Sequence, residues 1–423
     1  MRFIADLHTH SKYSRATSSE MNLESLWKWA QLKGITVVGT GDFTHPVWFS
    51  EIKEKLEPAK ANLLKLKDKF KDITIPESCR SDVYFMLTAE ISSIYSKKGR
   101  TRKIHNLVFA PDFSIASRIN TVLSKIGNLS SDGRPILGLD AKRLLKIVLD
   151  ASPDGMLVPA HAWTPHFSIF GAESGFDSLS ECFEELTPHI YSIETGLSSD
   201  PPMNWRLSSL DRITLMSNSD AHSPSKLGRE ANIFDTGISY RAMMDAIKNK
   251  NGFVGTIEFF PEEGKYHYDG HRSCGVRTSP KDTIKNNFVC PVCGRKVTIG
   301  VMHRVEKLAD RPEGFNLKNA PKYYSLIPLS EIIAETLHVG VNTKRVEAEY
   351  FKLIYALGNE LRILMKSSLS DIEKAGSSSF AEAISKMRAG KVHISPGFDG
   401  EYGKIKIFDE SGRKEITKQE TLF

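Results

Sequence analysis

Seven short apolar runs, each followed by polar turn residues, restrict the fold of this chain more than any other feature of its sequence. Most of them are rich in β-branched or aromatic residues, as strands are, and they lie at 3–4, 35–38, 83–87, 107–109, 156–158, 190–193 and 213–216. Helical patterns separate most of these runs, for example at 23–32, 59–70, 141–149 and 178–186. This alternation predicts a parallel sheet in an α/β fold, and seven repeats favour a barrel-like arrangement.

Imidazoles and carboxylates follow most of these runs. Because strand ends converge on one face of a βα barrel, side chains far apart in the sequence should form one cluster there. Two residues at positions i and i+2 of a strand have their side chains on the same face. His8 and His10 have this spacing, and so do Asp220 and His222. The candidate metal ligands are His8, His10, Asp42, Glu90, His105, His161, Asp220 and His222.

Eight candidate ligands are more than one ion needs. We therefore expect two or three divalent ions (zinc, magnesium or manganese), with the two oxygens of Glu90 able to bridge a pair of them. Asp6 is expected to orient a ligating histidine. Glu194 fits the metal site and an ordinary polar strand end equally well, and weaker candidates are His45, His166 and Asp200. A lone histidine at a strand end is usually structural, but seven equivalent positions make coincidence a poor explanation.

A second metal site is predicted from two close pairs of ligands. His271 and Cys274 form one pair, and Cys290 and Cys293 form the other, 15 residues further along. This spacing is typical of a structural zinc, and Gly294 supplies the turn after the last cysteine. His267 or His303 could replace His271 as the fourth ligand. The chain has five cysteines in all, which is no disulfide framework, so a reducing cytoplasmic compartment is expected.

The net charge of +6 is unevenly distributed. Residues 1–273 carry 33 Lys+Arg and 33 Asp+Glu, whereas residues 274–423 carry 24 and 18. A basic C-terminal third suits a polyanion such as nucleic acid, although a merely soluble basic surface explains the charge equally well. No run of about 18 apolar residues predicts a membrane span, and the polar start of the chain is unlike a signal peptide.

Basic residues near both predicted metal sites are candidates for DNA contact. The loop 96–103 lies between Glu90 and His105, so we expect it at the rim of the first site, where it could also steer a small phosphorylated metabolite. Other basic residues surround the predicted zinc, where they could be only a solvated face. The candidates are Lys97, Lys98, Arg100, Arg102, Lys103, Arg272, Arg295 and Lys296.

The strand-end motifs resemble those of the polymerase-and-histidinol-phosphatase (PHP) superfamily. The matching segments are DLHTH at 6–10, GTGD at 39–42, the Glu90 strand, PAHAW at 159–163 and SNSDAH at 217–222. The resemblance implies a distorted (βα)7 barrel with a multinuclear metal site that hydrolyses phosphoesters. Phe43 stands where many members have a histidine, and a ligand common soon after His-x-His is missing from 11–19.

Over its whole length the chain resembles the endonuclease Q family. The segments that carry this likeness are YHYDGHRSCGV at 266–276, CPVCGRKVTIGVMHRVEKLADRP at 290–312 and PGFDGEYGKIKI at 396–407. It implies a PHP barrel at 1–262, a small zinc-binding module at 263–315 and a mainly helical DNA-binding region at 316–423. It also implies a DNA repair enzyme that nicks 5′ to uracil, hypoxanthine or xanthine and at abasic sites.

The expected mechanism is metal-assisted hydrolysis in which Glu90, Asp220 and His222 act as catalytic residues. A damaged base must leave the stack to be read, and its pocket would need aromatic faces. The candidates for that pocket are Tyr13, Tyr95, Trp163, Phe167, Phe170 and Trp205, each of which could equally be a core aromatic.

The expected partner is double-stranded DNA with a damaged base in the cytoplasmic nucleoid, with no role for a membrane. Single-stranded DNA, a sliding clamp or another repair factor is left open. Two rival functions remain at this point: a PHP-type small-molecule phosphatase acting on a substrate like histidinol phosphate, and a non-catalytic DNA-binding protein. An assay on uracil-containing DNA separates all three.

Overall fold

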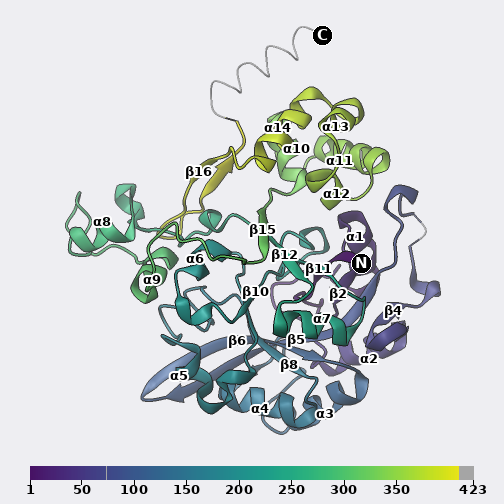
Figure 1. Cartoon of the computed structure of the whole chain (residues 1–423), viewed down its shortest axis with the longest axis horizontal. Helices are drawn as coiled ribbons and strands as arrows, with labels where there is room; N and C mark the ends of the chain where they lie inside the picture. The colour runs from purple at the N-terminus through teal and green to yellow at the C-terminus, as the bar shows by residue number, and fades with distance from the viewer. Residues whose placement is uncertain (73, 409–423) are drawn as a thin grey trace.

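The computed structural model describes residues 1–72 and 74–408, and it has one large mixed sheet at its centre (Figure 1). In the described chain the sheet has 11 strands in the order β15-β12-β11-β1-β2-β5-β4-β3, and the remaining three branch from β5, with β6 and β7 beside it and β8 beside β6. The strands are β1 (Arg2–Asp6), β2 (Val37–Gly39), β3 (Leu56–Pro58), β4 (Leu64–Leu66), β5 (Tyr84–Lys97), β6 (Arg100–Ala110), β7 (Ile136–Leu137), β8 (Met156–Pro159), β11 (Ala231–Asp235), β12 (Phe253–Glu258) and β15 (Lys322–Ser325).

Several strand pairs are antiparallel, so the expectation of a parallel sheet was wrong. The pairs β1–β2 and β2–β5 are parallel, but β5–β6, β6–β8 and β1–β11 are antiparallel. The reason is local at β5 and β6, because only Lys98 and Gly99 join them, with φ of 52° and 73°. Two consecutive residues with positive φ form the tight turn of a hairpin and leave no room for a helix.

The strands β9 (Ser192–Glu194) and β10 (Thr214–Met216) form a separate parallel pair. The backbone N–H of Ala162, just after β8, donates to the Glu194 carbonyl oxygen at 2.9 Å, and so connects this pair to the large sheet. The described strands therefore do not form one continuous ladder. An α/β fold with a central mixed sheet is confirmed, whereas the closed barrel stays a prediction.

Helices cover the outside of the sheet. Their apolar faces are buried against it: α1 begins at the cap Asn22, buries Leu26 and Ala30, and ends at Gly34 with a φ of 89°. These helices are α1 (Leu23–Lys33), α2 (Pro46–Lys55), α3 (Phe113–Leu123), α4 (Ala141–Ala151), α5 (Leu179–Phe183), α6 (Pro201–Trp205) and α7 (Tyr240–Asn249).

The helix expected at 59–70 was wrong. Leu64 and Leu66, two residues apart, are both buried while Lys65 between them is exposed. This is the alternation of a strand, and β4 pairs with β3 and touches β5, in agreement with it.

The remaining residues form a small Cys-containing module and a helical region. The module has β13 (Asp269–His271), β14 (Val276–Thr278), α8 (Pro280–Lys285) and α9 (Val301–Leu308). The helical region has α10 (Leu329–Leu337), α11 (Lys344–Leu357), α12 (Glu360–Met365), α13 (Leu369–Ala375) and α14 (Ser378–Arg388), followed by the hairpin β16 (His393–Ser395) and β17 (Lys404–Lys406). Residues 409–423 of the predicted region 316–423 lie outside the described chain.

A buried ion pair joins the helical region to the sheet domain. Lys33 at the end of α1 donates to Glu360 in α12 at 2.6 Å, and the Tyr350 hydroxyl and the Leu329 backbone N–H donate to the same carboxylate. Because both charges are buried, removing either one would leave the other unpaired, which is costly. This contact fixes α12 against α1 (Figure 1).

The turn between β16 and β17 packs on the Cys-containing module. Asp399 in that turn accepts from the Arg272 backbone N–H at 2.7 Å and from the Thr298 hydroxyl at 2.5 Å, and the Tyr268 N–H donates to the Gly397 carbonyl oxygen. Gly397 has no room for a Cβ, because the Gly264 carbonyl oxygen would lie 2.4 Å away. The glycine-rich end of the chain therefore belongs structurally to the module. Within the described residues, no helix is both long and apolar enough to cross a bilayer.

Glu258 at the end of β12 predicts a pH-dependent stability. The side chain is fully buried, one oxygen accepts from the Thr195 hydroxyl at 2.9 Å, and the other has no hydrogen-bond partner. Burial raises the pKa of its carboxyl to about 8. The folded chain therefore binds a proton that the unfolded chain releases near its ordinary pKa of about 4.5, and stability falls as the pH rises through this window.

We expect Glu258→Gln to reduce that pH dependence by at most about 1.4 kcal/mol per pH unit between pH 5 and 8. Urea unfolding of both proteins at several pH values measures it. Asp245→Asn, which changes an exposed residue of α7, is the control. Parallel pH profiles for Glu258→Gln and the unchanged protein would contradict the prediction.

Candidate metal centre

Loops after β1 and β10 bring one group of three predicted ligands together. His8, His10 and Asp220 each place a ligand atom within 4.8 Å of the other two. His10 Nε2 lies 3.0 Å and His8 Nε2 3.7 Å from Asp220 Oδ1. The two loops are joined by the His10 backbone N–H, which donates to the Ala221 carbonyl oxygen at 3.1 Å. This group forms because the strand-end loops run side by side.

A second group comes from β5, β6 and the loop after β8. Glu90 Oε1 lies 2.8 Å from His105 Nδ1 and 2.9 Å from His161 Nε2. Glu90 and His105 share a face of the β5–β6 hairpin, in which Ser92 pairs with His105 and Glu90 with Leu107. All three side chains are buried or nearly so.

Glu90 belongs to both groups. While its Oε1 faces His105 and His161, its Oε2 lies 3.4 Å from His10 Nε2 and 3.7 Å from His8 Nε2. One oxygen of Glu90 therefore faces each group, and its bridging role stays a prediction. Six of the eight predicted ligands lie in the two groups.

Asp42 has a different place from the one predicted. Its Oδ1 lies 3.1 Å from His10 Nδ1, the nitrogen on the far side of the ring from Asp220, and its Oδ2 accepts from the Ser11 and Ser14 hydroxyls at 2.7 and 2.8 Å. With its oxygens engaged in this way, Asp42 lies behind His10 and orients its ring. The sequence does not distinguish a carboxylate that binds metal from one that orients a histidine, since both follow the ends of strands.

Glu194 orients the ring of His8 in the same way as Asp42 orients that of His10. Its oxygens lie 3.1 and 3.0 Å from His8 Nδ1, and it also accepts from the Asn218 side chain and the His161 backbone N–H. Asp6, expected to orient a histidine, instead accepts from the backbone N–H groups of Ser219 and Gly228. It therefore holds the loop that carries Asp220.

His222 lies at the edge of the first group, with its ring centroid 4.6 Å from that of His10. Its Nδ1 is 2.8 Å from the Asp220 carbonyl oxygen, so Nδ1 carries the hydrogen and Nε2 is left with a free lone pair. Of the weaker candidates, His45 and Asp200 cap α2 and α6, and His166 is exposed. None of these three belongs to a described ligand group.

The carboxylates give the site a strongly negative field. Burial alone would lower the pKa values of His8 and His10, but Glu194 and Glu90 raise that of His8 well above its ordinary value, and Asp42 and Asp220 do the same for His10. His105 differs, because its burial dominates and lowers its pKa to about 4. Cations must displace the protons on His8 and His10, so the affinity for metal should rise with pH.

The donor atoms fit divalent metal ions. His8 Nε2 is completely buried, has no hydrogen-bond partner, and faces the carboxylates of Glu90 and Asp220. Buried polar atoms of this kind are rare unless something else binds them. Three residues of the site also have a strained backbone, since Asp42, His161 and Asp220 have positive φ values of 49°, 30° and 47°.

The four predicted zinc ligands also converge. His271, Cys274, Cys290 and Cys293 place their ligand atoms within 4.8 Å of one another, and Gly294 has the expected positive φ of 72°. His303 is engaged elsewhere, because its Nδ1 lies 2.7 Å from Asp269 Oδ2. His267 is buried and lies outside the described ligand groups. The geometry suits a closed tetrahedral site.

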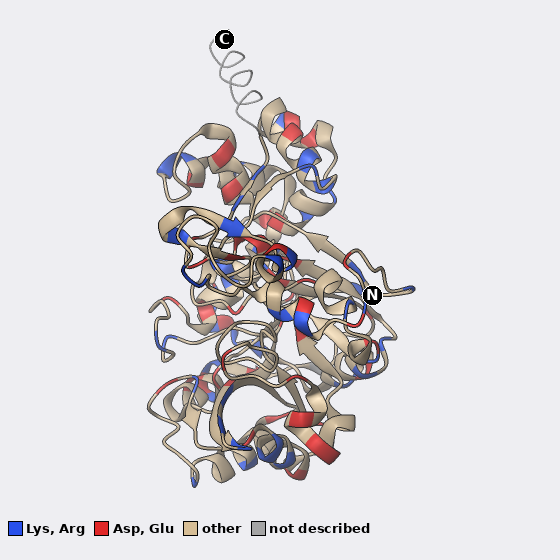
Figure 2. Cartoon of the chain, turned by 90° about the vertical axis from the view of Figure 1, so that its left-hand side faces the viewer, with Lys and Arg blue, Asp and Glu red and all other residues tan. Residues whose placement is uncertain are grey.

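The tip of the basic loop lies away from the site, contrary to expectation, whereas Lys103 at its end lies over the Phe167 ring. The loop is the tip of the β5–β6 hairpin, and Arg100 is five residues from His105, about 17 Å along a strand at roughly 3.3 Å per residue. Arg102 is buried, donates to the Gly175 carbonyl oxygen and stacks on Phe176, while Lys97 is paired with Glu184. Of the other candidates, Lys103 is partly buried, and the exposed ones are Lys98, Arg100, Arg272, Arg295 and Lys296. In Figure 2 basic and acidic residues are interspersed.

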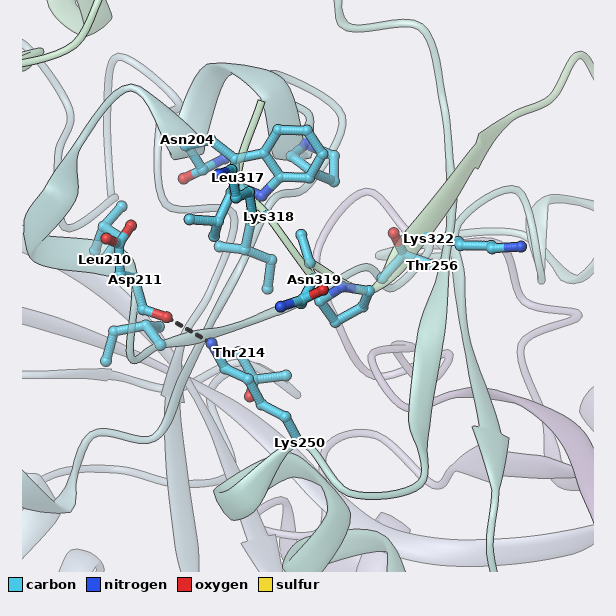
Figure 3. A pocket seen from close by; sticks show the side chains of 16 residues that line it. Asn204, Leu210, Asp211, Thr214, Lys250, Thr256, Leu317, Lys318, Asn319 and Lys322 are labelled. Atoms are coloured by element: carbon cyan, nitrogen blue, oxygen red, sulfur yellow. Dashed lines mark hydrogen bonds between the residues drawn. The ribbon is translucent and has the colours of Figure 1, made fainter. Parts of the chain in front are cut away.

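Most of the candidate aromatic residues do not line an opening at the site. Trp163 and Phe170 are buried against each other, and Tyr95 lies 3.7 Å from the sulfur of Cys182. Phe167 remains a candidate, because its partly exposed ring lies 4.8 Å from that of His105. So does Tyr13, which stacks on His45 at 4.5 Å. Trp205 lines a cavity of about 150 Å³ (Figure 3) at the start of β10, whereas Asp220 follows the end of that strand.

Arg134 is a member of the site that the sequence pattern did not reveal. Its Nη1 lies 3.0 Å from Glu90 Oε2, and its side chain is 24% exposed. It comes from the long segment between α3 and α4, which has no strand-end motif. Only Gly133 beside it offered a signal, and many turns contain glycine.

Asp42→Asn should weaken metal binding at the first site. The amide keeps the size of the side chain but loses the charge that holds the His10 ring, and such supports typically contribute 10–100-fold in affinity. A competition titration with a chelating dye measures the affinity. Asp245→Asn is the control, and an unchanged affinity in Asp42→Asn would contradict the assigned role.

Cys293→Ser should remove one zinc equivalent per chain and lower the melting temperature, because a structural site loses its closed coordination. Elemental analysis and thermal unfolding measure the two effects. Val292→Ser is a matched control, since Val292 is the exposed neighbour. Full zinc occupancy in Cys293→Ser would show that another ligand completes the site.

Comparisons with known proteins place the chain in a family. Residues 328–391 match the model of the MJ0043 C-terminal domain. The uncharacterized protein MJ0043 of Methanocaldococcus jannaschii is 36% identical over 253 residues, which are 58% of this chain and 31% of that protein, so the chain spans about a third of its length. The uncharacterized protein YqxK of Bacillus subtilis is 31% identical over 310 residues, which are 72% of this chain and 74% of that protein.

Two solved structures match almost the whole chain. One is the lesion-specific endonuclease PfuEndoQ of Pyrococcus furiosus, with a TM-score of 0.84, 31% identity, and coverage of 97% of this chain and 96% of that one. The other is an endonuclease Q in complex with a 27-mer duplex substrate that has an abasic lesion at the active site, with a TM-score of 0.82, 31% identity, and coverage of 97% and 98%. The chain belongs to the endonuclease Q family.

Proposed function

We propose that this chain is a metal-dependent DNA endonuclease that nicks one strand of a duplex at abasic sites and 5′ to deaminated bases. The observation that carries the proposal is the position of Glu90 between two groups of three ligands. The resemblance to endonuclease Q supports the abasic substrate, since one solved relative is bound to such a duplex. The choice of uracil, hypoxanthine and xanthine as substrates rests on the sequence resemblance alone.

The proposed site holds two divalent ions of zinc, magnesium or manganese. His8, His10 and Asp220 would hold one, and Glu90, His105 and His161 would hold the other. Such ions, when bound, supply an activated water and offset charge on a phosphate. A separate structural zinc would be held by His271, Cys274, Cys290 and Cys293. On this proposal residues 1–262 form the PHP barrel and 263–315 the zinc module.

The protein's own groups position these parts and move protons. Asp42 and Glu194 hold the rings of His10 and His8 in the orientation that directs Nε2 into the site. His222 is partly exposed and its Nε2 has a free lone pair, and burial lowers its pKa, so it can accept a proton at neutral pH. It is our candidate for the general base that accepts a proton from the attacking water, while the leaving 3′ oxygen takes a proton from solvent, which would give 3′-hydroxyl and 5′-phosphate ends.

The DNA surface in this proposal includes the exposed basic residues Arg272, Arg295 and Lys296 beside the zinc site. The helical region 316–408 is joined to the sheet by Lys33 and Glu360 and would contact the same duplex. A sliding clamp or another repair factor remains a hypothesis that these observations do not support further. Because its substrate would be chromosomal, the nucleoid is the proposed place of action.

Asp220→Asn should abolish nicking, with a loss of at least about a hundredfold, because Asp220 faces both His8 and His10. The assay uses duplexes that are undamaged or contain one abasic site, uracil or hypoxanthine, in Mg²⁺ or Mn²⁺. Asp235→Asn, with its exposed side chain, is the matched control. Nicking that persists in Asp220→Asn would refute the site. Hydrolysis of histidinol phosphate without nicking would favour the small-molecule phosphatase.

A further inference from the structure

Arg134 combines a fixed charge with partial exposure at the centre of the site. Its Nη1 donates to Glu90 Oε2 at 3.0 Å, on the carboxylate that both ligand groups share. Among the described residues, this is the one hydrogen bond of its guanidinium, which has five N–H groups. Its side chain is 24% exposed, whereas Glu90 is buried. The remaining donors of Arg134 therefore have no hydrogen-bond partner among the described residues, on a side chain that solvent reaches.

The loop that carries Arg134 is built against the supports of His10. Gly133 donates its N–H to the Tyr13 carbonyl oxygen at 3.0 Å, and the Ser92 N–H donates to the Pro135 carbonyl oxygen at 3.1 Å. A Cβ on Gly133 would lie 2.3 Å from both Asp42 Oδ2 and Ser14 Oγ. Glycine is therefore required there, because it lets the backbone pass over Asp42 and places Arg134 beside Glu90.

Asp132 adds a further restraint. Its Oδ1 accepts from the backbone N–H of Arg134 at 3.0 Å and from that of Arg15 at 3.2 Å. These contacts fix the loop on both sides of Arg134 while leaving its guanidinium to Glu90.

We propose that Arg134 is a catalytic residue that binds a non-bridging oxygen of the scissile phosphate. The proposal rests on the proposed function and names a group of the same site. Glu90 holds one edge of the planar guanidinium, so the remaining N–H groups are preoriented toward a phosphate in the opening. Guanidinium groups match phosphate oxygens as paired donors, and they stay charged at every working pH.

Arg134 contributes most when negative charge grows on the phosphate oxygens during attack by water. A fixed cation at that place needs no reorganisation, and removing one such donor typically costs 10²–10³-fold in kcat. Arg134→Lys keeps the charge but loses the planar pair of donors. It should therefore recover only part of the lost rate.

The test compares Arg134→Gln, Arg134→Lys and the unchanged protein. Metal content and melting temperature are measured first, then single-turnover nicking of an abasic duplex, then the affinity of the metal-loaded proteins for inorganic phosphate by calorimetry. We expect Arg134→Gln to keep its metal and stability, to lose 10²–10³-fold in rate, and to bind phosphate at least tenfold more weakly. Arg15→Gln is the control, since its exposed side chain pairs only loosely with Asp132.

The outcomes separate this inference from the function itself. If the unchanged protein fails to nick any duplex, the proposed function is wrong, and the phosphate affinities still decide whether Arg134 binds phosphate. Unchanged phosphate affinity and rate in Arg134→Gln would overturn the inference. A loss of metal in proportion to the loss of rate would overturn it too, because Arg134 would then act only through Glu90.

Discussion

The site depends on the single carboxylate of Glu90. One oxygen of Glu90 contacts His105 and His161, and the other faces His8, His10 and Arg134. The loops after β1 and β8, the strands β5 and β6, and the segment between α3 and α4 must therefore meet at one point. The strained backbone at His161 and Asp220 follows from that requirement, at a cost of order 1–3 kcal/mol for each such residue. Strain of this kind persists only where the surrounding structure fixes it.

Two buried carboxylates give the site its precision. Asp42 and Glu194 each hold the Nδ1 side of one histidine, and each is itself held by several donors, including the Ser11 hydroxyl and the Asn218 amide. Burying these charges is costly, and hydrogen bonds offset the cost. The result is that His8 and His10 present Nε2 to the site in only one orientation, which is the condition for tight and selective metal binding.

Charged groups that are buried or partly buried join the sheet, the Cys-containing module and the helical region. Arg304 in α9 donates to the carbonyl oxygens of Phe170 and Phe176 and so connects the Cys-containing module to the loop after His161. Glu360 connects the helical region to α1, and Asp399 connects the last hairpin to the module. These contacts hold the exposed basic residues of the module at a set position relative to the metal-ligand groups.

The sequence by itself determined the residue types of the site and their local geometry. Local spacing predicts the metal ligands, because strand and turn geometry act over a few residues. This holds for His8 and His10, which are two residues apart, and for the paired ligands around Cys290. The tertiary structure alone decided that Arg102 is buried, that Asp42 supports His10, and that Arg134 contacts Glu90. Those outcomes depend on contacts between residues that are 30 or more positions apart in the sequence, and the local periodicity of the sequence does not predict such contacts.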